Sequence, residues 1–217
     1  DDPWVTPKGY LQLQRFHLEG TTPVWSYAVA DALLEKRVWM QPDANTTFIR
    51  YTLLRGSQPL ALHLAALATY RDHHGNVQRR GSFPLHVEPI SHGVRVSTSD
   101  AGQPFYLLSG VAETAPALCV WQRGYHLAIE HARGQEDWEC YCHVADLRAT
   151  LRAGEAVTVV ACTEPVAELD GTRAYAVRQK YEQALLAAAP ASLAPPPAAI
   201  QPALAIRHLL LAADQFI

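Results

Sequence analysis

Alternating hydrophobic and polar residues dominate the first part of the chain, most clearly between residues 45 and 74. Thr46–Leu54 and Leu60–Ala68 both alternate with a period of two, which is typical of strands that place one face in a core. The connection Arg55–Pro59 contains a glycine and a proline. The pattern therefore predicts an antiparallel hairpin that ends in the polar cluster Tyr70–His74.

Shorter runs of the same kind lie on both sides of this segment, with turn residues between them. The predicted short strands are Val24–Tyr27, Leu34–Met40, Leu85–Glu88, Gly93–Ser97, Phe105–Ser109, Leu118–Trp121, Gly124–Glu130 and Ala156–Cys162. Many short strands at a spacing of ~8–12 residues are typical of a sandwich rather than a βαβ fold. We therefore predict a mainly β protein, with an antiparallel β-sandwich over residues 1–170.

The pattern changes to a helical one after Asp170. Residues 171–189 predict an amphipathic helical strap, because apolar side chains recur at helical spacing at Ala174, Val177, Tyr181, Ala184 and Leu185. Residues 190–202 form a linker rich in alanine and proline. Residues 203–217 read as a helix that ends on Ile217 without a stop signal, so we expect this helix to be the first of a missing domain.

Composition and charge narrow the possible partners. The 217 residues carry a net charge of −3 and contain no basic block, which argues against nucleic acid and anionic membranes as partners. No apolar run approaches the ~20 residues that span a bilayer. Asp1–Trp4 has neither an initiator methionine nor a signal-peptide profile, so we expect the chain to be cut from a longer product. We predict a cytoplasmic protein without a cofactor.

Four cysteines occur, at positions 119, 140, 142 and 162. Their even number permits two disulfides, but their density is low and we favour reduced thiols. The run Cys140–His143 suggests a metal site, yet zinc ligands usually follow a Cys-x2–4-Cys spacing and no second such pair occurs. We favour small buried residues on a strand and predict no metal.

The densest group of carboxylates lies between residues 130 and 139. Glycoside hydrolysis needs two carboxyl groups roughly 5–10 Å apart. Glu136 and Asp137 are neighbours and would point to opposite faces of an extended segment. A self-sufficient enzyme using this pair is the weakest alternative, and we predict no catalytic residue. Trp138 beside them could stack on a pyranose ring or could belong to a core or interface.

A second candidate group is Arg71-Asp72-His73-His74. It could contact a sugar or a phosphate at a loop. The alternative, which we favour from these residues alone, is an internal pair of Arg71 and Asp72 with both histidines facing solvent.

Several short matches keep their order along nearly the whole chain. They are Gly9-Tyr10, Phe16, Pro23-Val24-Trp25, Glu35-Lys36, Asn45-Thr46-Thr47, Tyr51, Leu53-Leu54, Arg71-Asp72-His73, Arg133-Gly134, Glu136-Asp137 and Ala212–Ile217. As an ordered set they make the chain resemble the N-terminal region of glycogen debranching enzymes of the bacterial and archaeal type, the amylo-α-1,6-glucosidase family.

The resemblance implies a supersandwich-like β-sandwich joined to an (α/α)6 toroid that carries the catalytic acids and acts on α-1,6 branch points of glycogen. The expected partners are that toroid, α-glucan and, for the isolated chain, a second copy. We predict a non-catalytic domain in which Arg71, Asp72, His73 and Trp138 contact sugar or the missing domain. The alternative is a purely structural sandwich without glycan contact.

Overall fold

The computed structural model of the chain describes residues 6–72, 75, 77, 85–98, 102–165, 168–189 and 200–214, with the backbone alone for residues 200–204. The described strands form an antiparallel eight-stranded sheet, in the order β1-β2-β3-β4-β11-β8-β7-β6, and a three-stranded sheet, in the order β5-β10-β9. The prediction of a mainly β protein with antiparallel sheets and C-terminal helices is therefore confirmed.

The chain divides into two compact units, and each is described by itself. Unit 1 comprises residues 1–60, 151–158 and 168–217. Its elements are the 3-10 helix η1 (Gly9–Gln12), β1 (Leu13–Glu19), β2 (Thr22–Val29), β3 (Ala32–Met40), β4 (Thr46–Arg55), the start of β11 (Ala156–Cys162), α2 (Gly171–Ala188) and α3 (Ile200–Ala213). Its core includes Trp39, whose ring stacks on that of Phe48 at a centroid distance of 5.3 Å.

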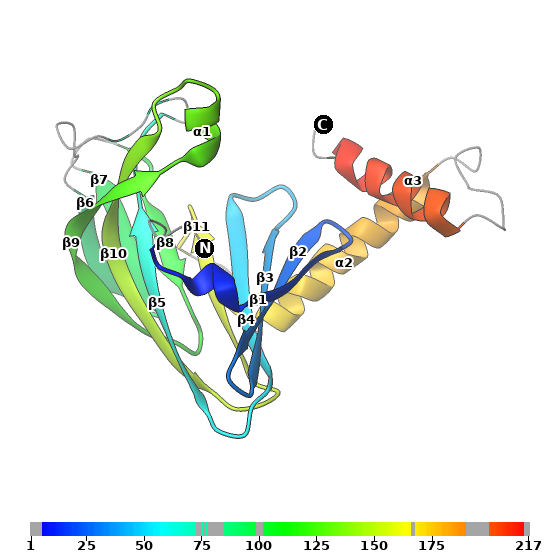
Figure 1. Cartoon of the computed structure of the whole chain (residues 1–217), viewed down its shortest axis with the longest axis horizontal. Coiled ribbons are helices and arrows are strands. Elements are labelled where there is room, and N and C mark those ends of the chain that lie inside the picture. Colours follow the sequence, from blue (N-terminus) through cyan, green and yellow to red (C-terminus); the bar gives the residue numbers. More distant parts are fainter. Residues whose placement is uncertain are drawn as a thin grey trace. The chain divides into compact units, whose positions relative to one another are not determined.

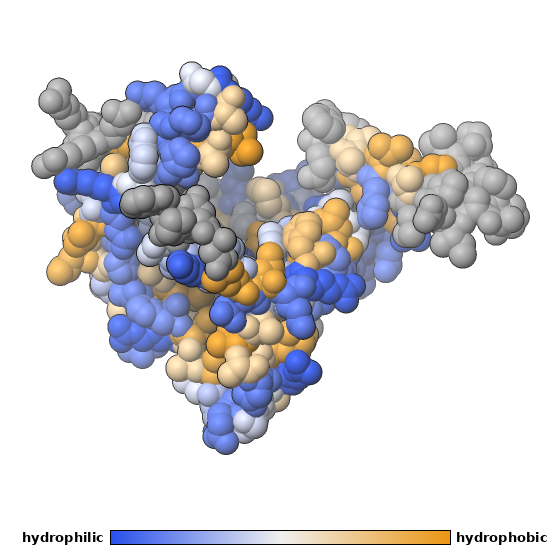
Figure 2. All heavy atoms as spheres, in the orientation of Figure 1, coloured by the Kyte–Doolittle hydropathy of each residue, from blue (hydrophilic) through white to orange (hydrophobic). Residues whose placement is uncertain are grey.

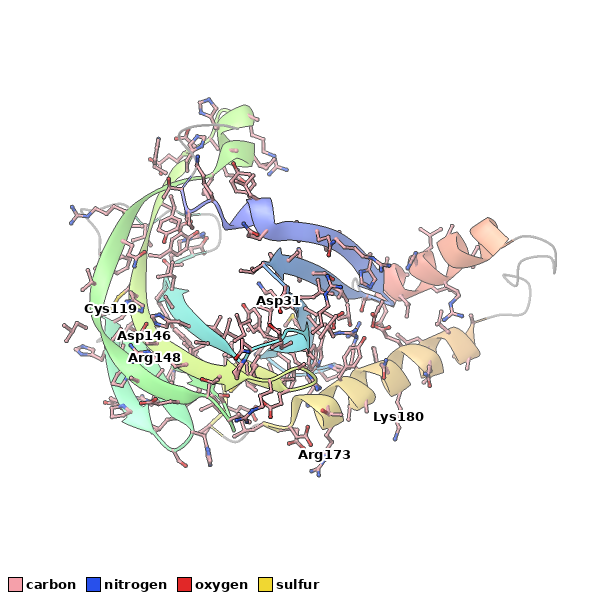
Figure 3. The ribbon with its side chains drawn as sticks, turned by 60° about the horizontal axis from the view of Figure 1, so that its bottom comes forward. Asp31, Cys119, Asp146, Arg148, Arg173 and Lys180 are labelled. Atoms are coloured by element: carbon pink, nitrogen blue, oxygen red, sulfur yellow. A yellow bond between two sulfur atoms is a disulfide. The ribbon has the colours of Figure 1, made fainter. Side chains whose placement is uncertain are left out.

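Helix α2 begins at a side-chain cap. The carboxylate of Asp170 accepts hydrogen bonds from the backbone N–H groups of Thr172 (2.9 Å) and Arg173 (3.3 Å), which would otherwise lack partners. Arg173 and Lys180 point away from the helix into solvent (Figure 3). No helix of the described residues is long and apolar enough to cross a membrane.

The buried face of α2 differs from the predicted apolar stripe. Its buried residues are Gly171, Ala174, Arg178 and Glu182. Val177, predicted on the apolar stripe, is 51 % exposed. The charged pair can be buried because the turn between β1 and β2 supplies partners: Arg178 donates to Thr21 Oγ1 at 2.6 Å, and Thr21 N donates to Glu182 at 3.2 Å.

Unit 2 comprises residues 61–150 and 159–167. Its elements are β5 (Leu60–Ala68), β6 (Leu85–Ile90), β7 (Gly93–Thr98), β8 (Phe105–Leu108), β9 (Glu113–His126), α1 (Ala128–Ala132), β10 (Trp138–Leu151) and the end of β11. Figure 1 shows α1 at the end of the long ribbon formed by β9 and β10. Val94, Val96 and Val144 are fully buried and belong to the core of this unit.

The predicted hairpin between residues 46 and 68 is wrong, although both of its strands exist. Strand β4 lies between β3 and β11, whereas β5 pairs with β10 in the other sheet. The backbone of Leu53 is already paired, because its N–H donates to Glu155 O at 3.0 Å and its C=O accepts from Gly154 N at 2.7 Å. The segment just before β11 therefore pairs with the edge of β4 at which β5 was expected.

The region from Gly124 to Leu151 also differs from the prediction. The strand expected over Gly124–Glu130 ends at His126, and α1 follows it. The 14-residue strand β10 was not predicted as one element. Register shifts between Glu139 and Tyr141 and again near His143 interrupt its alternation, so its sequence does not show one continuous period of two.

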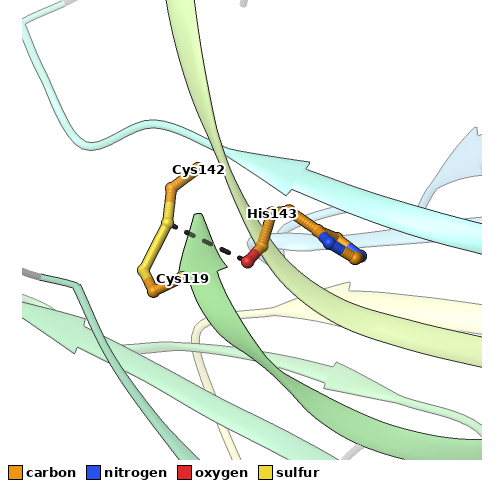
Figure 4. The surroundings of a disulfide bond; sticks show 3 residues. All are labelled: Cys119, Cys142 and His143. Atoms are coloured by element: carbon orange, nitrogen blue, oxygen red, sulfur yellow. Dashed lines mark hydrogen bonds between the residues drawn. A yellow bond between two sulfur atoms is a disulfide. The ribbon is translucent and has the colours of Figure 1, made fainter. Parts of the chain in front are cut away.

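The expectation of four reduced thiols is also wrong. A disulfide joins Cys119 on β9 to Cys142 on β10, with their Cα atoms 5.4 Å apart (Figure 4). Cys140 and Cys162 are free and buried. Cys142 is thus a bonding partner within the three-stranded sheet rather than part of the Cys140–His143 metal motif that was considered.

Candidate functional site

The predicted site residues that the structure describes lie in unit 2. Arg71 and Asp72 follow the end of β5, and Trp138 is the first residue of β10. His73 and His74 lie outside the described residues.

Arg71 is engaged with a buried carboxylate. Its Nε and Nη2 donate to the two oxygens of Glu139, the latter over 3.3 Å, and its Nη1 donates to the backbone C=O of Asp72 over 3.0 Å. The side chain of Glu139 is 1 % exposed and that of Arg71 is 24 % exposed. A buried carboxylate needs a paired cation, so Arg71 stabilises the start of β10.

Two tyrosines extend this network. Tyr141 donates from its hydroxyl to Glu139 Oε2 at 3.0 Å, and burial, followed by that hydrogen bond, raises its pKa. Its ring meets that of Tyr125 edge to face at 4.8 Å. Sequence reasoning predicted an Arg71–Asp72 pair and missed Glu139, because the partner lies 68 residues away along the chain.

Trp138 lies on the other side of β10 from this network. Neighbouring residues of a strand alternate between its faces, and here Glu139 is buried while Trp138 is 53 % exposed. Trp138 is the register partner of His126 on β9, and the two rings lie 5.1 Å apart between centroids. The predicted residues Arg71 and Trp138 therefore share one end of β10 but do not form one site.

Three further side chains lie beside Trp138, and we call Trp138, His126, His131 and Asp137 the Trp138 cluster. Asp137 Oδ2 lies 2.6 Å from His131 Nδ1 and 3.4 Å from His126 Nε2. The hydrogen bond with His131 is the main cause that lowers the pKa of Asp137. The histidines were not singled out from the sequence, where the spacing His-x4-His-x5-Asp was the available signal.

The loop that carries this cluster is fixed by its own backbone. Leu127 N donates to Asp137 O at 2.7 Å, and Gln135 N donates to Glu130 O at 3.0 Å. Gly134 has a φ of +70°, a conformation that glycine adopts without strain. Figure 2 shows mostly hydrophilic residues with a few hydrophobic ones over this end of the unit.

A cavity of about 320 Å³ lies in unit 1, beside the turn between β1 and β2. Its lining includes Glu19, Tyr175, Gln179, Glu182 and Leu211. Of the predicted site residues that the structure describes, Arg71, Asp72 and Trp138, none lines it. The Trp138 cluster therefore remains the candidate site. It places the exposed indole at the start of β10 beside polar side chains of the loop between β9 and β10.

Comparison with known proteins identifies the family. The family described as "Glycogen debranching enzyme N terminal" matches residues 1–158, which include Arg71 and the whole Trp138 cluster. A comparison with curated proteins gives no match. The match covers more than half of the chain and agrees with the resemblance found in its sequence. The chain therefore belongs to the family of N-terminal domains of glycogen debranching enzymes.

Proposed function

We propose that this domain is non-catalytic, that it supports the (α/α)6 catalytic domain of a cytoplasmic glycogen-debranching glycoside hydrolase, and that it contacts α-glucan through the Trp138 cluster. Membership of the debranching-enzyme family supplies the substrate class. The exposed indole of Trp138 is the observation that carries the contact.

An indole and a pyranose ring are complementary in shape and polarity. The C–H face of a glucose unit is apolar and packs on an aromatic ring, while its hydroxyl groups require hydrogen-bonding partners. Trp138 offers the ring, and His131 and Asp137 lie in the same loop with their imidazole and carboxylate groups. The cluster thus combines the two kinds of contact that a glucan needs.

Two of the described carboxylates near Trp138, Glu139 and Asp137, support a non-catalytic role. Hydrolysis of a glycosidic bond needs two carboxyl groups that face each other across the sugar, roughly 5–10 Å apart. Glu139 is buried and paired with Arg71, and it lies on the opposite face of β10 from Trp138. Asp137 is already bonded to His131.

A second candidate function is a structural domain that never touches glycan. The contacts of Arg71 favour it, because this arginine donates to Glu139 and to the backbone of Asp72. Under this alternative the Trp138 cluster would pack against another protein domain.

Titration calorimetry with maltoheptaose and with glycogen on the 217-residue chain separates the two functions. We expect wild-type protein to bind, and Trp138→Ala to weaken binding by about five- to tenfold, because a ring contact contributes roughly 1 kcal/mol. Phe16→Ala is the matched control, since Phe16 is 55 % exposed but lies in unit 1.

Equal affinity of wild type and Trp138→Ala would contradict the glycan contact. So would the absence of any binding by the wild-type chain. Either result, with Trp138→Ala still folded by circular dichroism, would leave the structural function as the better account.

A further inference from the structure

The Trp138 cluster holds three groups of the kind that bind transition metals. We infer that His126, His131 and Asp137 form a binding site for a divalent ion of the Zn²⁺ class. The inference rests on their geometry and does not depend on glucan binding.

The donor atoms converge on one point. His126 Nε2, His131 Nδ1 and an Asp137 carboxylate oxygen all lie within 4.8 Å of one another. Asp137 Oδ2 is 2.6 Å from His131 Nδ1 and 3.4 Å from His126 Nε2. Ligands at the ~2.0–2.2 Å bond lengths of tetrahedral zinc lie about 3.3 Å from each other, so small rotations of the side chains suffice.

The donor set favours zinc over the abundant hard cations. Two imidazole nitrogens and one carboxylate oxygen match the three-ligand zinc sites that keep a fourth position for water. Calcium and magnesium prefer shells made of oxygen. His126 and His131 are exposed, so water can reach the fourth position.

Neighbouring contacts hold the ligands in place. The bond from Leu127 N to Asp137 O closes the loop at 2.7 Å. Trp138 packs against the ring of His126, and the rings of His126 and His131 lie 5.4 Å apart. Such supporting contacts reduce the ordering that binding requires, which raises metal affinity.

The same unit offers a matched comparison. Asp146 Oδ1 also lies close to two histidines, at 2.7 Å from His63 Nε2 and 3.1 Å from His143 Nε2. Among the described residues, however, only the Trp138 cluster brings three potential ligands within 4.8 Å of one another. His63→Ala therefore removes a histidine of similar surroundings without touching the proposed site.

Titration calorimetry with ZnCl2 on the whole 217-residue chain tests the inference, with visible spectroscopy of Co²⁺ as a second readout. We expect one Zn²⁺ bound with micromolar affinity. His131→Ala and Asp137→Asn should each weaken binding at least about tenfold, and His63→Ala should leave it unchanged. The Co²⁺ spectrum should lack thiolate charge-transfer absorption, because no cysteine belongs to the site.

Wild-type affinity in both His131→Ala and Asp137→Asn would overturn the site. So would a loss in His63→Ala equal to that in His131→Ala, or a thiolate band in the Co²⁺ spectrum. If His131→Ala does not fold by circular dichroism, His131→Gln replaces it in the same comparison. Failure of this experiment leaves glucan binding at Trp138 untouched, since that is measured without metal.

Discussion

Single residues of this domain show how buried charges are matched by partners distant in sequence. Glu139 is almost fully buried at the start of β10, and Arg71 from the end of β5 balances it. Tyr141 adds a hydroxyl donor to the same carboxylate. Removing the cation would leave a buried carboxylate charge without its paired cation, with the hydroxyl of Tyr141 still donating to it.

Arg71→Ala should therefore lower the free energy of unfolding by about 2–3 kcal/mol, slightly less than for a fully buried pair because Arg71 is 24 % exposed. Urea denaturation measures the change. Arg133→Ala is the control, because Arg133 is 64 % exposed and its surface pair with Glu130 contributes about 0–1 kcal/mol. Equal losses in the two variants would show that the Arg71–Glu139 pair contributes no more than a surface contact.

Glu19 couples stability to pH through Arg37. Burial raises the pKa of Glu19, but the hydrogen bonds and charge of Arg37, assisted by Tyr175, outweigh burial and lower it below the ordinary 4.5. The unfolded chain then binds the proton more tightly than the folded one, so acid favours unfolding. The contribution is complete well above pH 4.5 and is lost as the pH falls through the lowered pKa.

Urea denaturation measured at several pH values should show that the free energy of unfolding of the wild type falls as the pH drops below 4.5. Glu19→Gln should make this fall with pH less steep. Arg37→Gln removes the charged partner of Glu19 and should also make the free energy of unfolding depend less steeply on pH in this range. An unchanged slope in both variants would mean that Glu19 does not contribute to the acid sensitivity.

Among the elements, α2 and the turn between β1 and β2 depend on each other. Gly20 in that turn has a φ of +61°, and a side chain on it would meet the carboxylate of Glu182. That carboxylate accepts from Thr21 N at 3.2 Å and from Arg178 at 2.9 Å. The turn thus needs glycine for its backbone and for the close approach of the helix.

Gly20→Ala should destabilise the chain by the backbone strain of about 1 kcal/mol and by a further ~2 kcal/mol for the displaced Glu182. Gly154→Ala separates the two effects, because Gly154 has a φ of +88° with open space around it. Thermal unfolding of both variants provides the measurement. A loss in Gly20→Ala no larger than in Gly154→Ala would show that the contact with Glu182 is unimportant.

Elements whose pattern is local were predictable from sequence. The bounds of β11 agree with the predicted Ala156–Cys162, and α2 ends one residue before the predicted position 189. The position of β11 beside β4 was not predictable, because β11 lies about a hundred residues later in the chain. β10 was missed because its bulges break the period of two.

The candidate site was predictable only in part, for the same reason. Trp138 and Arg71 stand out by their residue types, and both lie at the same end of β10. Trp138 and Arg71 lie on opposite sides of β10 because Glu139, the partner of Arg71, is buried while Trp138 is exposed. The residue type of Glu139 does not reveal this burial. The approach of His126 and His131 to Asp137 depends on the course of the loop around α1.

At the scale of the whole molecule, the family match and the exposed Trp138 cluster both support the proposal that this domain contacts α-glucan. The family match ends at residue 158, within β11, and it includes all elements of the candidate site. Under the proposed function, glucan contact at the Trp138 cluster would let the domain help to position the substrate.

The most direct test follows the five tryptophan indole N–H signals of the 217-residue chain by NMR while maltoheptaose is added. Trp138→Phe identifies the signal of Trp138 by its disappearance. The account predicts that this signal shifts with saturation as the sugar binds, while the others move little. A titration in which no indole signal moves, or in which only other tryptophans respond, would contradict it.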